Sequence, residues 1–181
     1  MRQAPGAILG GMPKSSTLAR LEAAILLGVA VAVVAWVSWM APRSPVLALL
    51  GAVAIALGHS FFLAAEFLLV PLTRRGDPAP AASARELLRA WWVETWLDVV
   101  VFAWRQPFRW RRHPDRLAGP GVHGRRGVVL VHGIVCNRGF WNPWLARLEA
   151  QGCAFVAVNL EPVFASIDDH LECVDKAVAG V

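Results

Sequence analysis

Gly127-Val128-Val129-Leu130-Val131-His132-Gly133-Ile134 sets the architecture of the last third of this chain. Its apolar residues follow one another without alternation, which is typical of a β-strand covered on both faces, as in the parallel sheets of α/β proteins. The short length and the glycine at each end argue against a helix. The stretch therefore predicts a buried strand that ends in a backbone turn at His132-Gly133.

The residues after this strand predict a helix and a second strand. Asn142 precedes Pro143, which favours Asn142 as the N-cap and Pro143 as the first helical residue. Gly152 is placed to end that helix in the left-handed conformation. The apolar run 154–158 then predicts a second strand, which a right-handed crossover would place parallel to the first.

A last helix is predicted from Ser166 onward. Ser166 and Asp169 have the spacing of a capping box. The apolar residues that follow recur at helical spacing, namely Ile167, Leu171, Val174, Val178 and Val181. Residues 122–181 are therefore expected to form a β-α-β-α arrangement of the α/β class.

The first strand, its His132-Gly133 turn and the helix after it resemble the opening of an α/β-hydrolase domain of the esterase and lipase type. The stretches 159–162 and 166–169 are similar to membrane-anchored bacterial members of the same group. The resemblance covers residues 125–181, about a third of the chain.

This resemblance implies hydrolysis of carboxylic, lipid-like esters by a serine nucleophile. It implies that the N–H of Ile134 supplies half of an oxyanion hole, where it would stabilise the tetrahedral intermediate. Gly133 would let the backbone approach the substrate, and His132 would shape the turn. Acyl transferases and haloalkane-cleaving enzymes have related folds, and the sequence does not separate these activities.

The catalytic triad of that family has no counterpart among the 181 residues, which hold no Gly-x-Ser-x-Gly elbow. Gly58-His59-Ser60 lies inside a long apolar segment and is not such an elbow. We expect the elbow to follow Val181, so the chain would be the N-terminal part of a hydrolase and inactive alone. The alternative is a non-catalytic two-span membrane protein that carries a hydrolase-like remnant as an interaction module.

Two long apolar runs, 23–40 and 46–70, account for much of the 56% hydrophobic content. Each is long enough to cross a hydrocarbon core of about 30 Å as a helix. The connector between them is too short to cross anything, so they predict a two-helix transmembrane hairpin after a cytoplasmic tail over 1–22. A cleaved signal peptide is the alternative for the first run, but the apolar core is too long and lacks a small-x-small cleavage site.

Basic residues flank this predicted hairpin, whereas its tip holds only Arg43. The flanking residues are Arg2, Lys14 and Arg20 before the hairpin and Arg74, Arg75, Arg85 and Arg89 after it. By the positive-inside rule both termini would face the cytoplasm from a bacterial-type inner membrane. His59 and Glu66 lie within the second run, where ionisable residues are candidates for function, so a small transporter centred on His59 is a third alternative.

Residues 71–121 form a basic, tryptophan-rich connector. Ser83 and Glu86 have capping-box spacing and predict a helix over 84–104. Charged residues inside this helix argue against a third span, so we expect it at the cytoplasmic headgroups, with anionic lipid as partner. The residues expected at the interface are Trp91, Trp92, Trp96, Trp104, Arg105, Arg109, Arg111 and Arg112. Nucleic acid is the competing partner of a basic patch, but the apolar runs upstream favour lipid.

The sequence predicts neither a metal site nor a cofactor site. Glu94 and Asp98 are one helical turn apart but lack further ligands at matching spacing. A literal G-x-G-x-x-G over 119–124 precedes the strand instead of following one, so it indicates a loop. No C-x-x-C pair is present, and free thiols in a reducing compartment are expected for Cys136, Cys153 and Cys173.

Overall fold

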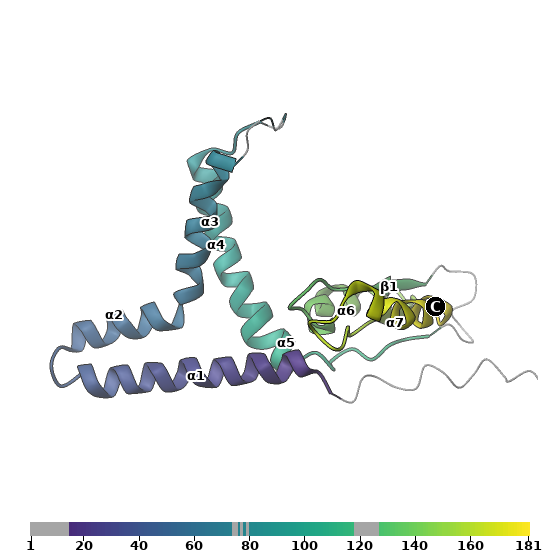
Figure 1. The fold of residues 1–181 in the computed structure, drawn as a ribbon, viewed down its shortest axis with the longest axis horizontal. Helices are drawn as coiled ribbons and strands as arrows, with labels where there is room; N and C mark the ends of the chain where they lie inside the picture. Colours follow the sequence, from purple (N-terminus) through teal and green to yellow (C-terminus); the bar gives the residue numbers. More distant parts are fainter. Residues whose placement is uncertain (1–14, 74–75, 77, 79, 118–126) are drawn as a thin grey trace, which may run out of the picture. The chain divides into compact units, whose positions relative to one another are not determined.

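The computed structural model describes residues 15–73, 76, 78, 80–117 and 127–181 (Figure 1). The described chain is mostly helical and contains one two-stranded parallel sheet. It divides into two compact units, one of Met1–Ala23 with Val101–Val181 and one of Ala24–Val100. We refer to these as the α/β unit and the helical unit.

Helix α1 (Thr17–Met40) begins six residues before the predicted first span. Ser16 starts it, because its hydroxyl oxygen accepts a hydrogen bond from the N–H of Ala19 at 3.2 Å. Within the described residues, α1 is the one helix that is long and apolar enough to cross a membrane alone. It lies near the N-terminus, where a signal sequence has the same properties.

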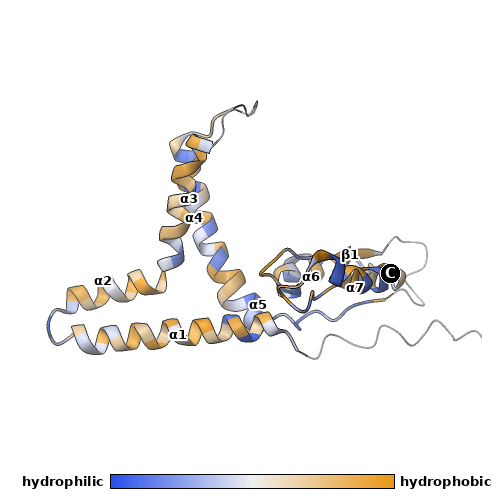
Figure 2. Cartoon of the chain, viewed as in Figure 1, coloured by the Kyte–Doolittle hydropathy of each residue, from blue (hydrophilic) through white to orange (hydrophobic). Residues whose placement is uncertain are grey.

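The apolar run 46–70 does not form one continuous helix, so the prediction of a single straight helix there is wrong. Helices α2 (Pro45–Ala56) and α3 (Gly58–Thr73) meet at a bend of 64°, and by length and composition the pair is apolar enough for a broken span or a re-entrant segment. Gly58 favours the break because glycine is a poor helix former. Apolar residues nevertheless dominate both helices (Figure 2).

Helix α2 contacts α1 where Trp36 lies against Gly51. The indole N–H of Trp36 donates to the carbonyl oxygen of Leu47 at 3.2 Å. A Cβ atom on Gly51 would lie 2.1 Å from Nε1 of Trp36, so any larger residue would force the indole to move. Ser44 caps α2 by accepting from the N–H of Leu47.

Helix α3 packs side by side with α4 (Ala84–Val100; Figure 1), and a small polar cluster lies at their contact. The hydroxyl oxygens of Ser60 and Thr95 lie 3.1 Å apart, and Nε2 of His59 lies 3.3 Å from the carbonyl oxygen of Thr95. The indole N–H of Trp91 donates to the carbonyl oxygen of Ser60 at 2.9 Å. The side-chain polar groups of His59 and Ser60 therefore have hydrogen-bond partners in the contact between α3 and α4.

The helix predicted over 84–104 is confirmed, although its last turn is a π-helix. Ser83 and Glu86 form the expected capping box, with the N–H of Ser83 donating to Glu86 at 2.8 Å. After α4 come η1 (Val101–Arg105), which is π-helical, and α5 (Gln106–Phe108).

The α/β unit contains the predicted strand-helix-strand-helix order. Its elements are β1 (Val128–Leu130), the 3₁₀ helix η2 (Arg138–Trp141), α6 (Asn142–Ala150), β2 (Phe155–Ala157) and α7 (Ile167–Ala179). The strands pair in parallel, with Val129 opposite Val156. Leu145 and Phe155 pack on one face of the sheet and Val156 and Ala177 on the other, which confirms a sheet covered on both faces.

Local helix signals in this unit were mostly correct. Ser166 and Asp169 form the predicted capping box of α7, and Gly152 has a φ of +68° just after α6. The prediction of Asn142 as N-cap of α6 is wrong, because η2 runs directly into α6 and Trp141 occupies that position. The side-chain amide of Asn142 instead donates to the carbonyl oxygen of Arg109 at 3.0 Å.

The α/β unit begins earlier in the sequence than the predicted boundary at residue 122. Gln106 accepts a hydrogen bond from the backbone N–H of Asn137, and its carbonyl oxygen accepts one from the Asn137 amide at 2.9 Å. These contacts assign part of the predicted connector to the same compact unit. The G-x-G-x-x-G match over 119–124 lies outside the described residues.

Candidate functional site

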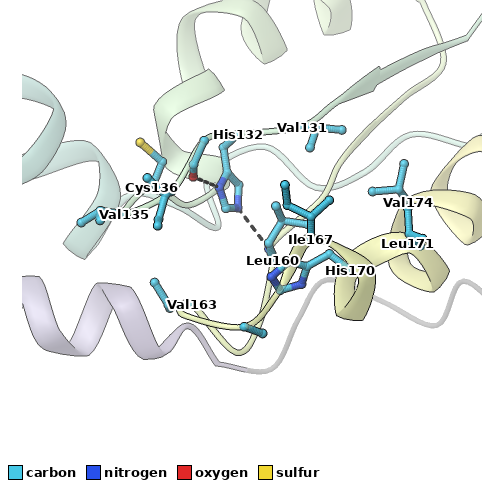
Figure 3. A pocket seen from close by; sticks show the side chains of 13 residues that line it. Val131, His132, Val135, Cys136, Leu160, Val163, Ile167, His170, Leu171 and Val174 are labelled. Atoms are coloured by element: carbon cyan, nitrogen blue, oxygen red, sulfur yellow. Dashed lines mark hydrogen bonds between the residues drawn. The ribbon is translucent and has the colours of Figure 1, made fainter.

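A cavity of about 450 Å³ opens beside the carboxyl ends of β1 and β2 (Figure 3). Its walls come from the loop after β1, the loop after β2 and helix α7, and they include Gly133, Ile134, Leu160, Ile167 and Leu171. The carboxyl ends of parallel strands are where open α/β sheets bind ligands. A largely apolar lining with few polar groups is typical of small-molecule pockets. The predicted oxyanion-loop residues therefore border a cavity of suitable size and chemistry.

His132 joins the two loops that border this cavity. Its Nε2 atom accepts a hydrogen bond from the N–H of Leu160 at 3.1 Å, and its Nδ1 atom lies 2.9 Å from the carbonyl oxygen of Gly133. These partners assign a neutral imidazole with its proton on Nδ1. Burial lowers the pKa of His132, and the Gly133 hydrogen bond and the charge of Glu161 oppose this effect. Because both ring nitrogens are engaged with backbone groups, His132 holds the two loops together, a role we call the His132 clamp, and does not act as a general base.

The backbone of the loop after β1 presents free donors and a strained residue. Among the described residues, none accepts a hydrogen bond from the N–H of Ile134, whose side chain is 78% exposed. Val135 has a φ of +56°, a conformation that β-branched residues rarely adopt. Such strain is found at sites where function requires a particular backbone path. The loop thus holds an unused N–H group at the edge of the cavity.

Cys136 and His170 are the other titratable groups that line the cavity. Burial raises the pKa of the Cys136 thiol, with a further contribution from the carboxyl of Glu22 and an opposing one from Gln106. This thiol is therefore protonated at neutral pH and a poor nucleophile. His170 comes from α7 and has no hydrogen-bond partner within the described segments. Sequence reasoning missed His170, although its position at helical spacing from Ile167 and Val174 places it on the same face of α7 as the apolar residues that line the cavity.

A buried polar network around Arg138 connects the segment after the β1 loop with the chain before β1 and with β2. Arg138 is fully buried, and its Nη2 atom donates to the carboxylate of Asp115 at 2.8 Å and to the carbonyl oxygen of His113 at 2.7 Å. The same carboxylate accepts from the N–H of Ala157 in β2 at 3.0 Å. Sequence reasoning missed this network, because an arginine in a loop is usually solvated and its partners lie more than twenty residues away.

The residues expected at the membrane interface belong to two different units. Trp91, Trp92 and Trp96 are in the helical unit, and the remainder of the set, Trp104, Arg105, Arg109, Arg111 and Arg112, is in the α/β unit. Trp92 and Trp96 are exposed, whereas the indole N–H of Trp91 donates a hydrogen bond from α4 to the carbonyl oxygen of Ser60 in α3. The guanidinium of Arg109 lies 5.7 Å from the ring centroid of Trp104.

The described residues contain no group of three or more His, Cys, Asp or Glu side chains that could hold a metal ion. Glu94 is exposed on α4. Burial raises the pKa of Asp98, and the neighbouring His59 opposes this effect. The three cysteines are free thiols.

Comparison of the chain with family models, with curated proteins and with solved structures found no match. The resemblance to α/β-hydrolases therefore stays a prediction from the sequence, carried by the strand over 127–131, the His132-Gly133 turn and the helices after it.

Proposed function

We propose that this chain is the N-terminal part of a membrane-anchored serine hydrolase that acts on carboxylic, lipid-like esters. The observation that carries the proposal is the unused N–H of Ile134 at the rim of an apolar cavity beside the carboxyl ends of two parallel strands. An ester substrate needs both features, a donor for its carbonyl oxygen and an apolar space for its acyl group.

In this proposal the chain binds and polarises the ester. The acyl group enters the cavity, and the N–H of Ile134 donates to the carbonyl oxygen as it becomes an oxyanion. One such donor contributes about 10²–10³-fold to the rate of acyl transfer. His132 and the Arg138 network hold the loop in place before substrate arrives. The three residues of the catalytic triad, the nucleophilic serine, the histidine base and the acid, are expected to follow Val181 in the sequence.

The membrane placement is part of the same proposal. Helix α1 crosses a bacterial-type inner membrane, α2 and α3 return into it, and both termini face the cytoplasm. The exposed tryptophans and arginines of α4 and of the segment after it would contact the headgroups. Such an anchor would hold the cavity near lipid-like substrates.

A second candidate is a non-catalytic membrane protein in which the α/β unit is an interaction module. One observation favours it: among the described residues that line the cavity, Cys136 is the only thiol and none has a hydroxyl, and burial raises the pKa of that thiol. Exposed apolar residues on α7, such as Ile167 and Leu171, would then contact a protein partner.

A fluorophosphonate probe separates the two candidates. The 181-residue chain should not react at any serine, and a chain extended through a Gly-x-Ser-x-Gly elbow should react at that serine. Ile134→Pro removes the N–H and should lower kcat of the extended enzyme by about 10²–10³-fold, whereas Ile134→Ala keeps it and serves as the control. Serine labelling of the 181-residue chain would mean that the active site is misplaced. An extended chain that does not react would favour the interaction module.

A further inference from the structure

An open groove of about 450 Å³ lies between α3 and α4 in the helical unit. Its walls are apolar and include Ala64, Phe67 and Leu68 of α3 and Ala84, Leu87 and Leu88 of α4. Leu68 is 76% exposed and Leu88 is 63% exposed, so apolar surface continues outside the groove. A groove of this composition suits a hydrocarbon chain.

Helix α4 carries cations and indole rings on the face beside this groove. Arg85, Arg89, Trp92 and Trp96 are spaced by four, three and four residues, so they share one side of the helix. All four are exposed, and the rings of Trp92 and Trp96 meet edge to face with centroids 5.9 Å apart. Each arginine directly follows a residue that lines the groove, so this Arg-Trp stripe borders it.

The stripe has an uncompensated positive charge within the described part of the chain. No described carboxylate forms a salt bridge with Arg85 or Arg89. Glu86 lies one helical turn before Arg89, but its carboxylate accepts hydrogen bonds from the N–H and the hydroxyl of Ser83. The guanidinium groups of Arg85 and Arg89 are therefore without an acidic partner in the part of the chain that the structure describes.

We propose that the groove and the Arg-Trp stripe bind one anionic phospholipid. Its acyl chain lies in the groove, and its phosphate accepts hydrogen bonds from Arg85 and Arg89, since guanidinium groups bind phosphate with two parallel donors. Trp92 and Trp96 lie at the level of the headgroup, where indoles are favoured. This inference rests on the proposed membrane placement and is independent of ester hydrolysis.

The test uses the 181-residue chain in nanodiscs of phosphatidylcholine that contain a small fraction of a photoreactive lipid. The probe is phosphatidylglycerol with a diazirine on its acyl chain, and phosphatidylcholine with the same diazirine is the zwitterionic counterpart. Peptide mapping after irradiation should place the phosphatidylglycerol label on residues 64–68 and 84–91. Each arginine should contribute roughly a fivefold preference over phosphatidylcholine.

Two variants act on different parts of the site. Arg85→Gln with Arg89→Gln should remove the preference for phosphatidylglycerol, and Ala84→Trp should fill the groove and remove labelling by both lipids. Arg147→Gln, at an exposed cation of the α/β unit, is the matched control. Equal labelling by both lipids, or labelling spread along all apolar helices, would overturn the proposal. Failure of the wild-type chain to enter nanodiscs would overturn the membrane placement itself, whereas the fluorophosphonate result bears only on hydrolysis.

Discussion

The Nε2 atom of His132 accepts a hydrogen bond from the backbone N–H of Leu160 at 3.1 Å. This contact joins the end of the first strand segment to the end of the second, twenty-eight residues later. Because Nδ1 is satisfied by the carbonyl oxygen of Gly133, the imidazole fixes both sides of the cavity mouth. The histidine of the His-Gly turn therefore has a structural role that its position in the sequence did not specify.

Replacing His132 should destabilise the α/β unit. His132→Phe keeps the ring volume but leaves the N–H of Leu160 without its acceptor, which costs about 1–3 kcal/mol of unfolding free energy. Denaturant unfolding of the purified chain, followed by tryptophan fluorescence, measures this change. His170→Phe is the control, since His170 has no hydrogen bond to another described residue. An equal effect of both variants would contradict the clamp.

The same histidine should make stability depend on pH. Burial lowers the pKa of folded His132, with a smaller contribution from the charge of His170, so the unfolded chain binds a proton that the folded chain does not. The contribution of His132 to the free energy of unfolding is fully present above the ordinary histidine pKa of about 6.5. It is lost as the pH falls from there toward the lower pKa of the folded state. Unfolding midpoints at pH 7.5 and 5.5 should differ more for the wild type than for His132→Phe.

Val135 should be strained in its left-handed conformation. Val135→Gly removes the Cβ clash, so the free energy of unfolding should stay the same or rise by up to about 1 kcal/mol despite the added chain entropy. Val129→Gly, in the middle of β1, should destabilise the chain, because it removes packing and adds entropy without relieving strain. Similar losses for the two glycine variants would show that Val135 is not strained.

Gly51 should be essential to the contact between α1 and α2. Gly51→Ala would place a methyl group against the indole of Trp36 and should cost about 1–3 kcal/mol through overpacking. Gly28→Ala is the matched control, since a Cβ at Gly28 meets no atom within 4 Å and alanine favours the helix. Thermal unfolding in nanodiscs should show a lower midpoint for the Gly51 variant alone.

Reporter fusions test the proposed topology. A reporter that works only in the cytoplasm should be active after Val181, and a reporter that requires export should be active at Arg43, because basic residues flank the apolar runs. Export-dependent activity after Val181 would contradict the cytoplasmic placement. It would also remove the argument that the free cysteines lie in a reducing compartment.

Local sequence patterns predicted the order and type of most elements. The capping boxes at Ser83 and Ser166 and the end of α6 at Gly152 were predicted, because caps and left-handed glycines depend on residues within one helical turn. The parallel pair was also predictable, since unbroken apolar runs on either side of a helix require a sheet covered on both faces. These features follow from local chain chemistry and from the need to bury apolar side chains.

Which polar groups contact one another depends on the tertiary fold. Arg138 is buried because Asp115, twenty-three residues earlier, accepts its hydrogen bond, and His132 is neutral because Leu160 supplies a donor. The break between α2 and α3 also depends on a distant partner, because His59 and Ser60, which follow it, form hydrogen bonds with Thr95 of α4. A buried polar group is stable only where a distant partner satisfies it, and periodicity along a single sequence contains no information about that partner.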